Sequence, residues 1–301
     1  MSNAVALLEE VARVTPLGFR FRDEQLGVLV GDGLAVTLRT GSAASPTLAA
    51  TTSPSGVFAF HALPGLVARP LPPARPRLPI QFGAGDADYW RTLPPPVAFT
   101  VDVDDPWGRF LPLSFQASAP TRDLFVPACL SGASSGAPAA DAIPLFSAPA
   151  RSVAGPIAVV RVELWDPVAS APAAWAVVEA QLAGGPPCRG MADAEGRLAL
   201  FLRYPPPDDP IHSVPASLVP GLGPPLTAQE WALELQAFYA RPAAPTAAPD
   251  LCTALAQPPA TLWADRGGGV PLGTLSVQFG RALLVRSRDT ATPAGRVRIT
   301  A

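Results

Sequence analysis

The feature that most constrains the fold is a turn followed by an alternating strand at residues 51–63. Pro54 and Gly56 predict a tight turn. Proline fixes φ at the second position of the turn, and glycine tolerates the left-handed backbone conformation at its last position. In the strand that follows, Phe58 and Phe60 share one face, which is typical of a half-buried β-strand. A similar pattern recurs around Gly196, 140 residues after Gly56. This spacing predicts two copies of one β-sandwich.

Proline and charge then exclude two classes of protein. The chain has 301 residues, 39 of them proline, and no apolar run approaches the roughly 20 residues that span a bilayer, although 49% of residues are hydrophobic. Membrane insertion is therefore not expected. The 22 basic residues are all arginine, the net charge is −2 and no basic stripe is present, so nucleic-acid binding is not expected either.

Alternating apolar patterns and Pro-rich segments divide the chain into five parts, and the predicted class is all-β with two tandem sandwiches. The predicted parts are an N-terminal helix (1–16), a first sandwich (17–126), a linker rich in Ser, Gly, Ala and Pro (127–152), a second sandwich (153–245) and C-terminal strands (246–301).

Three segments allow more than one interpretation. Trp231–Tyr239 is rich in helix formers, but its place in the repeat favours a strand. The C-terminal strands either return to a sheet or form a separate piece. The Pro- and Arg-rich segment 67–96 is either an ordered arm along the first sandwich or a contact surface for a partner. Residues 205–225 form a matching Pro-rich segment in the second copy.

The three cysteines, Cys129, Cys188 and Cys252, are far apart and lack metal or redox spacing. Free thiols in a reducing compartment are the expected state. The N-terminus carries Glu9 and Glu10 and no early basic residue, so it is not a secretory signal. We therefore expect a cytoplasmic protein, or one that leaves the cell as part of a larger particle.

No set of residues predicts a metal, a cofactor or a catalytic centre. His61 and His212 are too few and too distant for a zinc or iron site. The acidic groups Asp102, Asp104 and Asp105, and likewise Asp86 and Asp88, are expected on a wet strand face or in loops rather than as cation ligands.

Nucleophilic catalysis is not predicted either. Strand geometry carries His61 away from Ser55, and no GxSxG elbow is present. Glu163 and Glu179 give no sign of being an acid–base pair. We expect a protein that is not an enzyme.

The segment GLAVTLRT…LAATTSPSGVFAFHALPGL resembles carboxypeptidase-regulatory-like domains, and Ser53 to Gly65 carry the match best. The second copy, GMADAEGRLALFLRYP, matches less closely and lacks the terminal Pro-Gly. The resemblance implies a prealbumin-like, Ig-like sandwich for each copy.

A wider pattern resembles proteins encoded beside phage-tail-like contractile injection systems. It consists of LGFRF near Leu17, GRFLPLSF at 108–115, PLFSAPAR at 144–151 and PAAWAVVEA at 172–180. It implies a structural, adaptor or baseplate component that contacts other subunits of a multi-protein particle, with self-association left open. The candidate interface residues are Tyr89, Trp90 and Trp107, because buried aromatics dominate interface energies.

Two other functions remain as alternatives. One is a carbohydrate- or cell-surface-binding sandwich, in which exposed aromatics stack on sugars. The other is an enzyme with an unrecognised metal.

Two enzyme families that share the prealbumin-like sandwich do not fit this sequence. The chain lacks the closely spaced histidines of intradiol dioxygenases, and it ends in Arg-Ile-Thr-Ala where hydroxyisourate hydrolases end in Tyr-Arg-Gly-Ser.

Overall fold

The computed structural model describes residues 15–40, 47–64, 66, 94–131, 141–205, 227, 229–265, 269–287 and 295–301. The protein is mostly β, with 46% of residues in strands, 4% in helices and several sheets. Two short helices, α2 (Ala128–Ser131) and α4 (Leu251–Leu255), were not predicted. Of the expected N-terminal helix, all but its last two residues lie outside the described ranges.

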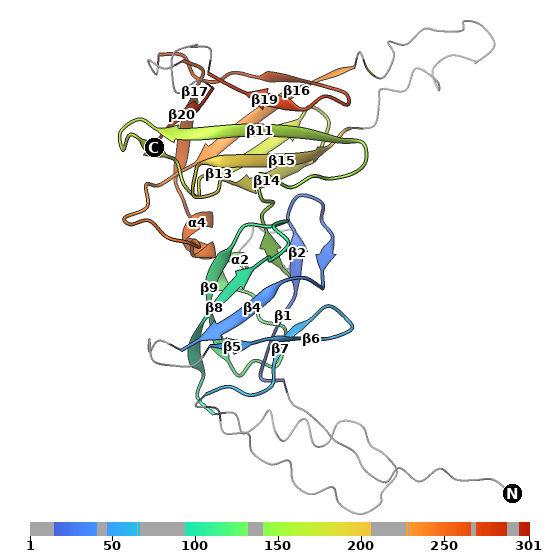
Figure 1. The fold of residues 1–301 in the computed structure, drawn as a ribbon, viewed down its shortest axis with the longest axis vertical. Helices are drawn as coiled ribbons and strands as arrows, with labels where there is room; N and C mark the ends of the chain where they lie inside the picture. The colour runs from blue at the N-terminus through green and yellow to red at the C-terminus, as the bar shows by residue number, and fades with distance from the viewer. Residues whose placement is uncertain are drawn as a thin grey trace, which may run out of the picture.

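The first half of the chain builds three small sheets (Figure 1). A four-stranded sheet has the order β5 (Leu48–Ala49), β4 (Ala35–Arg39), β8 (Val97–Asp104) and β9 (Leu113–Ala119). A second sheet has the order β1 (Leu17–Phe19), β7 (Phe58–Phe60) and β6 (Thr51–Thr52). The third has the order β10 (Ile143–Leu145), β2 (Phe21–Asp23) and β3 (Leu29–Val30).

The second half builds one ten-stranded sheet. Its main path runs β12 (Ala171–Pro172), β11 (Ile157–Asp166), β20 (Val297–Thr300), β17 (Pro259–Trp263), β16 (Glu230–Phe238), β13 (Val177–Leu182) and β14 (Pro187–Met191). Off this path, β15 (Arg197–Arg203) and β19 (Leu283–Val285) pair with β11, and β18 (Leu275–Gln278) pairs with β16.

Several strand pairings of the first half have a counterpart in the second. In the first, β1 pairs antiparallel with β7, β4 with both β5 and β8, and β8 with β9. In the second, β11 pairs antiparallel with β15, β13 with both β14 and β16, and β16 with β17. Each half also adds a parallel strand from farther along the chain, β10 on β2 and β19 on β11.

Two of the open interpretations are settled by this pairing. Trp231–Tyr239 is a strand for all but its last residue, because β16 alternates between buried and exposed positions and bonds β13 along its length. The C-terminal strands return to the sheet through β17, β18, β19 and β20.

The predicted linker, residues 127–152, needs a correction. Ile143, Leu145 and Phe146 are fully buried, and β10 lies parallel to β2 with Ile143 opposite Phe21. The backbone of β10 satisfies the open edge of β2 while its apolar side chains fill the first core. This part of the segment is therefore a strand of the first half and not a connection. Residues 132–140 lie outside the described ranges.

A cluster of phenylalanine rings forms the first core. Phe19 is fully buried and meets Phe60, Phe115 and Phe125 edge to face, with ring centroids 5.3–6.1 Å apart. Such pairs add about 0.5–1.5 kcal/mol each beyond the burial of their area. The predicted inward face of β7 is thereby confirmed at Phe58 and Phe60, which are both buried.

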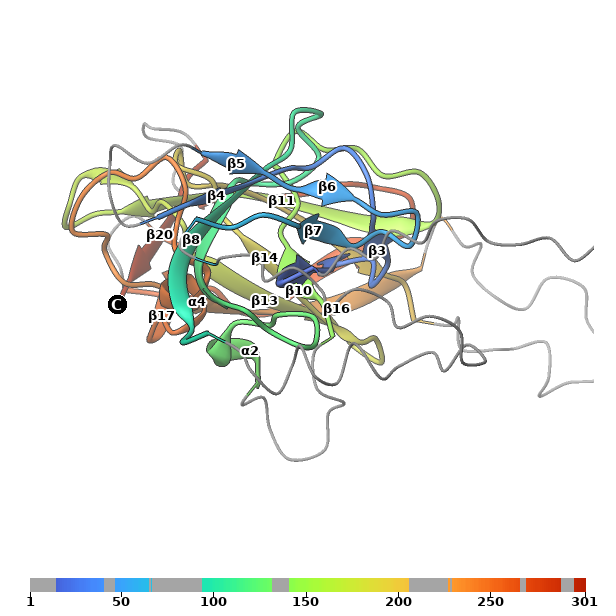
Figure 2. The same ribbon diagram turned by 90° about the horizontal axis from the view of Figure 1, so that it is seen from below.

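The first core extends into the second half. Trp175, Val177, Met191, Leu251 and Ala254 belong to the same buried cluster as the phenylalanines. A separate cluster fills the second half around β11, β13 and β15. The two halves stack end to end along the long axis, so they overlap when viewed from below (Figure 2).

The two turns that define the repeat have the same backbone hydrogen bonds. Gly56 N donates to Ser53 O (2.9 Å), and Gly196 N donates to Asp193 O (3.0 Å). Gly56 has a φ of 74° and Gly196 a φ of 73°, which L side chains rarely adopt. A Cβ on Gly196 would also press against the carbonyl oxygen of Leu164, closer than real Cβ atoms come.

Gly196→Ala should therefore destabilise the protein through two effects, the strain of a positive φ and the clash with the carbonyl oxygen of Leu164. Gly280 has a φ of 71° but open space around its Cβ position, so Gly280→Ala serves as the control. We expect a loss of about 1 kcal/mol for Gly280→Ala, and roughly 2 kcal/mol more for Gly196→Ala, measured by urea unfolding. Equal losses in the two variants would contradict this account.

Candidate functional site

Of the predicted interface residues, Trp107 lies in a described range, whereas Tyr89 and Trp90 lie outside them. The side chain of Trp107 is 64% exposed, in the turn between β8 and β9. An indole that remains this exposed on an ordered turn is available to a partner.

Asp105 builds this turn. Its carboxylate accepts hydrogen bonds from the backbone N–H groups of Trp107 (3.3 Å), Arg109 (2.7 Å) and Phe110 (3.1 Å). Gly108, with φ 66°, donates its N–H to Asp105 O (2.8 Å). Asp105 is therefore buried, and the expectation of a wet position for it is wrong, because the strand alternation ends at Asp104 and the chain turns inward.

The indole of Trp107 is held in place from two directions. The guanidinium carbon of Arg109 lies 4.5 Å from the indole centroid, within the range of a cation–π contact. Arg109 also donates to the backbone oxygen of Asp32 (2.9 Å). A Cβ on Gly33 would lie 2.7 Å from the indole, so only glycine fits beneath it. The exposed aromatic is thus presented in a fixed orientation.

The same five-residue turn occurs in the second half without the tryptophan. Asp193 accepts from the backbone N–H of Glu195 (3.0 Å) and of Arg197 (2.8 Å), as Asp105 does in the first half. Arg197 Nε donates to Asp193 Oδ2 (2.9 Å), as Arg109 Nε does to Asp105 Oδ2 (3.1 Å). Glu195 stands two residues after its aspartate, as Trp107 does, so the same local turn forms with or without a tryptophan at that place.

The junction of the two halves contains a buried ion pair. The carboxylate of Asp23, which has no exposed surface, lies 2.7 Å from the guanidinium of Arg151. The Arg151 guanidinium carbon lies 4.7 Å from the ring centroid of Phe110 and 5.8 Å from that of Phe201, one ring from each half. Arg151 also donates to Ser147 Oγ (2.8 Å).

The loop between β2 and β3 continues this junction. Asp23 Oδ1 accepts from the N–H groups of Gln25 and Leu26 (both 3.0 Å). Gln25 Nε2 then donates to Ala199 O (3.0 Å), and Arg203 donates to Leu26 O. A Cβ on Gly190 in β14 would lie 2.6 Å from a methyl group of Leu200 and 3.0 Å from the Gln25 amide nitrogen, so the absence of a side chain there leaves room for both.

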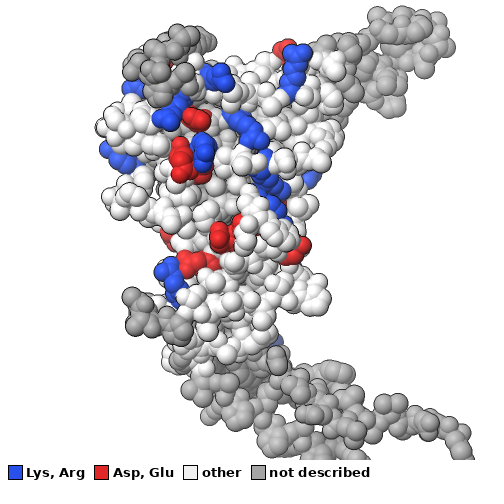
Figure 3. All heavy atoms as spheres, in the orientation of Figure 1, with Lys and Arg blue, Asp and Glu red and all other residues white. Residues whose placement is uncertain are grey.

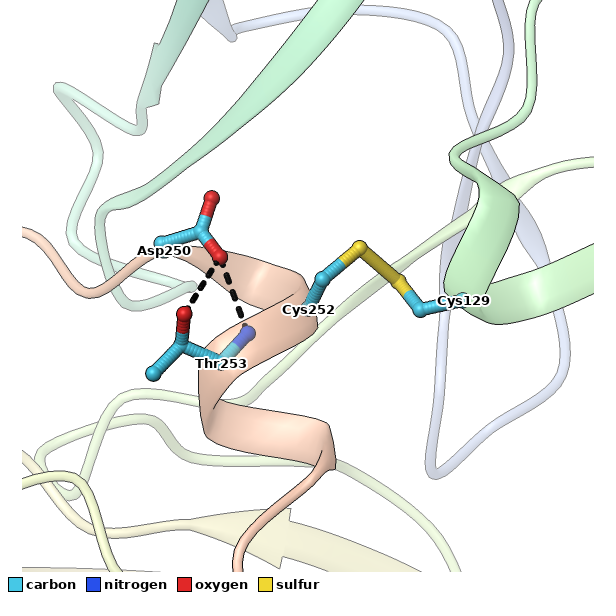
Figure 4. The surroundings of a disulfide bond; sticks show 4 residues. All are labelled: Cys129, Asp250, Cys252 and Thr253. Atoms are coloured by element: carbon cyan, nitrogen blue, oxygen red, sulfur yellow. Dashed lines mark hydrogen bonds between the residues drawn. A yellow bond between two sulfur atoms is a disulfide. The ribbon is translucent and has the colours of Figure 1, made fainter.

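A second group of contacts joins the halves around α4. Ser114 N donates to Pro249 O (2.9 Å) across the junction, and within the second half Gln257 Nε2 donates to Trp175 O (2.8 Å). A disulfide bond links Cys129 in α2 to Cys252 in α4 (Figure 4). The expectation of three free thiols is therefore wrong for this pair, because the fold brings together two cysteines 123 residues apart.

Cys188 is free, as expected, and it is buried. Burial raises the pKa of its thiol to about 12, and the thiol lies 3.6 Å from the carbonyl oxygen of Phe201. At neutral pH this cysteine remains a thiol and is a poor nucleophile.

The acidic and histidine side chains considered for chemistry have structural partners. Asp102 accepts two hydrogen bonds from Arg39, and His61 Nδ1 lies 3.1 Å from Thr15 Oγ1. Asp104 is exposed. His212, Asp86 and Asp88 lie outside the described residues.

The remaining candidates are also separated from one another. Glu163 pairs with Arg296 (3.3 Å) and Glu179 with Arg189 (2.5 Å), and the Ser55 hydroxyl lies 2.9 Å from that of Ser53. Within the described part of the chain, no three His, Cys, Asp or Glu side chains converge as a metal-binding group.

The surface carries few charges. On the face drawn in Figure 3, most of the described surface is uncharged, acidic groups gather where the halves meet, and arginines are dispersed over the upper half. Over the same described residues, no helix has the length and apolar character needed to cross a bilayer.

A third buried aspartate lies at the outer part of the second half. Burial by itself would raise the pKa of Asp166, but hydrogen bonds from Arg241 (2.8 Å), from the N–H groups of Ala169 and Val168, and from the Tyr239 hydroxyl lower it below its usual range. Burial and the nearby Asp166 charge raise the pKa of Tyr239 to about 12.

Sequence reasoning missed these aspartates as a group. Asp23, Asp105, Asp166 and Asp193 are buried, each accepts backbone N–H bonds within its own turn, and each pairs with an arginine. The available signal was an Asp followed three or four residues later by Gly, which is typical of side-chain-capped turns. Asp166 lacks that glycine, and its turn has Ser170 at φ 49° instead.

Loss of Arg151 should be far more destabilising than loss of an exposed arginine. Arg151→Gln leaves the Asp23 charge buried and uncompensated, which costs about 3–5 kcal/mol. The control is Arg189→Gln, whose pair with Glu179 is partly exposed and is worth about 1 kcal/mol or less. Urea unfolding measures both, and similar losses would show that the junction does not depend on this pair.

Acid should destabilise the protein partly through Asp166. The pKa of Asp166 is lower in the folded than in the unfolded protein, so its ionised form stabilises the fold. This contribution to the free energy of unfolding is complete above the unfolded-state pKa, about 4, and is lost as the pH falls through the lower folded-state pKa. Asp166→Asn should therefore be less stable at pH 7 and should lose less further stability on acidification. Urea unfolding from pH 6 to pH 2 tests this, and parallel pH curves for the two proteins would contradict it.

Comparisons with known proteins add no family to these observations. No protein-family model, no curated protein and no solved structure matches this chain.

Proposed function

We propose that the protein is a non-enzymatic structural or adaptor component of a phage-tail-like contractile injection particle. It acts through protein–protein contacts made by two tandem sandwich copies. The single observation that carries the proposal is the junction: a buried Asp23–Arg151 pair and a shared core join the two halves. A component that positions other subunits has to keep such a fixed geometry.

The tandem arrangement is supported by the strand pairings that the two halves have in common and by a parallel strand in each half, β10 on β2 and β19 on β11. The turns at Gly56 and Gly196, 140 residues apart, occupy the same place in this scheme. Each copy then has one Pro-rich segment, 67–96 or 205–225, between its turn strand and the next long strand.

Two features offer contacts to neighbouring subunits. Trp107 presents an oriented aromatic surface, and such residues anchor interfaces. The strands β5 and β6 end their sheets, and residues Ala49, Thr51 and Thr52 there are exposed, so their backbone groups can pair with an added strand. The Pro-rich segments, with Tyr89 and Trp90, are the other proposed interfaces.

The alternative is a module that binds carbohydrate or a cell surface. It is favoured by the exposed indole of Trp107 beside the Arg109–Asp32 pair (3.7 Å), since an aromatic face flanked by polar groups suits a sugar ring. Metal-dependent catalysis is a third class, which metal analysis of the purified protein would test.

Affinity purification of the tagged protein from its native host, with mass spectrometry and electron microscopy, tests the assembly. We expect sheath, tube or baseplate proteins and rod-shaped particles. A lone protein that binds glycans on an array would overturn the proposal in favour of the alternative.

Trp107→Ala should reduce recovery of the particle at least tenfold without altering the unfolding curve, because the exposed indole contributes little to the core. Glu195→Ala, at the equivalent position of the second turn, is the matched control and should leave recovery unchanged. A third variant, Tyr89→Ala with Trp90→Ala, tests the Pro-rich segment. If all three variants assemble normally, these aromatics are not anchors.

A further inference from the structure

The disulfide differs from the third cysteine in its surroundings. Cys129 is exposed on α2 and Cys252 is half-buried on α4, so a reductant in solution can reach the bond. The two helices come from different halves and face each other at the junction (Figure 4). Cys188 is enclosed in the second core.

We propose that Cys129 and Cys252 form a redox-sensitive lock on the junction, which closes by oxidation of the folded chain and fixes α4 against the first half. When the bond is reduced, the contact between α2 and α4 loosens while both halves remain folded.

The fold brings α4 into place without the bond. Leu251 and Ala254 are buried in the first core, and Ser114 N donates to Pro249 O immediately before the helix. Asp250 caps the helix, accepting from Thr253 N and Thr253 Oγ1 (both 2.8 Å). The Cα atoms of the two cysteines are 5.5 Å apart, the usual separation for a disulfide. The reduced thiols are therefore already adjacent.

The closing reaction is thiol–disulfide exchange with a low-molecular-weight disulfide such as oxidised glutathione. One cysteine thiolate attacks the glutathione disulfide and releases one reduced glutathione. The second cysteine thiolate then attacks the mixed disulfide and releases the other. Two protein thiols are oxidised, one disulfide is reduced, and the two thiol protons end on the two glutathione molecules.

Reduction should loosen the junction locally rather than separate the halves. The Asp23–Arg151 pair, the Gln25–Ala199 bond and the Ser114–Pro249 bond do not involve the cysteines. By contrast, α2 has four residues, too few to be stable as an isolated helix. The segment most dependent on the lock is therefore α2.

Cys188 does not compete for the bond. It is buried in β14, among the residues of the second core. Its pKa of about 12 leaves very little thiolate at neutral pH. Oxidation therefore yields one pairing.

The test uses the full-length protein equilibrated in buffers of defined oxidised-to-reduced glutathione ratio. Polyethylene glycol-maleimide labelling of the native protein counts accessible thiols, and circular dichroism follows thermal unfolding. We expect two labels in the reduced protein and none in the oxidised one. Reduction should lower the unfolding temperature by about 5–10 °C and speed proteolysis at α2.

Two variants separate the lock from general stability. Cys129→Ser should unfold at the lower temperature in every buffer, whereas Cys188→Ala should keep the full redox response. If Cys129→Ser does not fold, Cys252→Ser and the reduced wild-type protein supply the same comparison. Labelling of two thiols after equilibration with oxidised glutathione, or identical unfolding and proteolysis in both states, would overturn the proposal.

Discussion

A carboxylate buried where the two halves meet determines how they are arranged. Asp23 is out of contact with water, so its charge is tolerable only with full compensation. One oxygen accepts N–H groups of its own turn and the other meets Arg151. Because that guanidinium lies against one ring from each half, displacing either half would remove a ring that covers the buried ion pair. The pair therefore contributes to the uniqueness of the arrangement more than to its net stability.

The other three buried turn aspartates, Asp105, Asp166 and Asp193, are compensated in the same way. In each case the side chain replaces the hydrogen bonds that the turn backbone would have made to water, and an arginine neutralises the charge. The turns are consequently rigid without large apolar residues. A chain rich in proline and alanine benefits from this, because it has few bulky side chains with which to pack its loops.

Much of the strand pattern could be predicted, since alternation along β8 and β16 and the glycine at each repeat turn are local signals. The strand β10 could not, because its three residues include Pro144 and lie in a low-complexity stretch. Nor could the Cys129–Cys252 pairing, which depends on contacts 123 residues apart. For the candidate site, the turn that carries Trp107 was predictable, but the burial of Asp105 and the partnership of Arg151 depend on tertiary packing.

The position of β10 also determines when the sheets of the first half can be completed during synthesis. Its core lacks Ile143 and Leu145 until those residues leave the ribosome, although its other strands end at residue 119. Arg151 follows only six residues after β10, so the ion pair to Asp23 becomes available almost as soon as the last strand does. Completion of the sheets of the first half and preparation of its docking surface for the second are thus nearly one event on the growing chain.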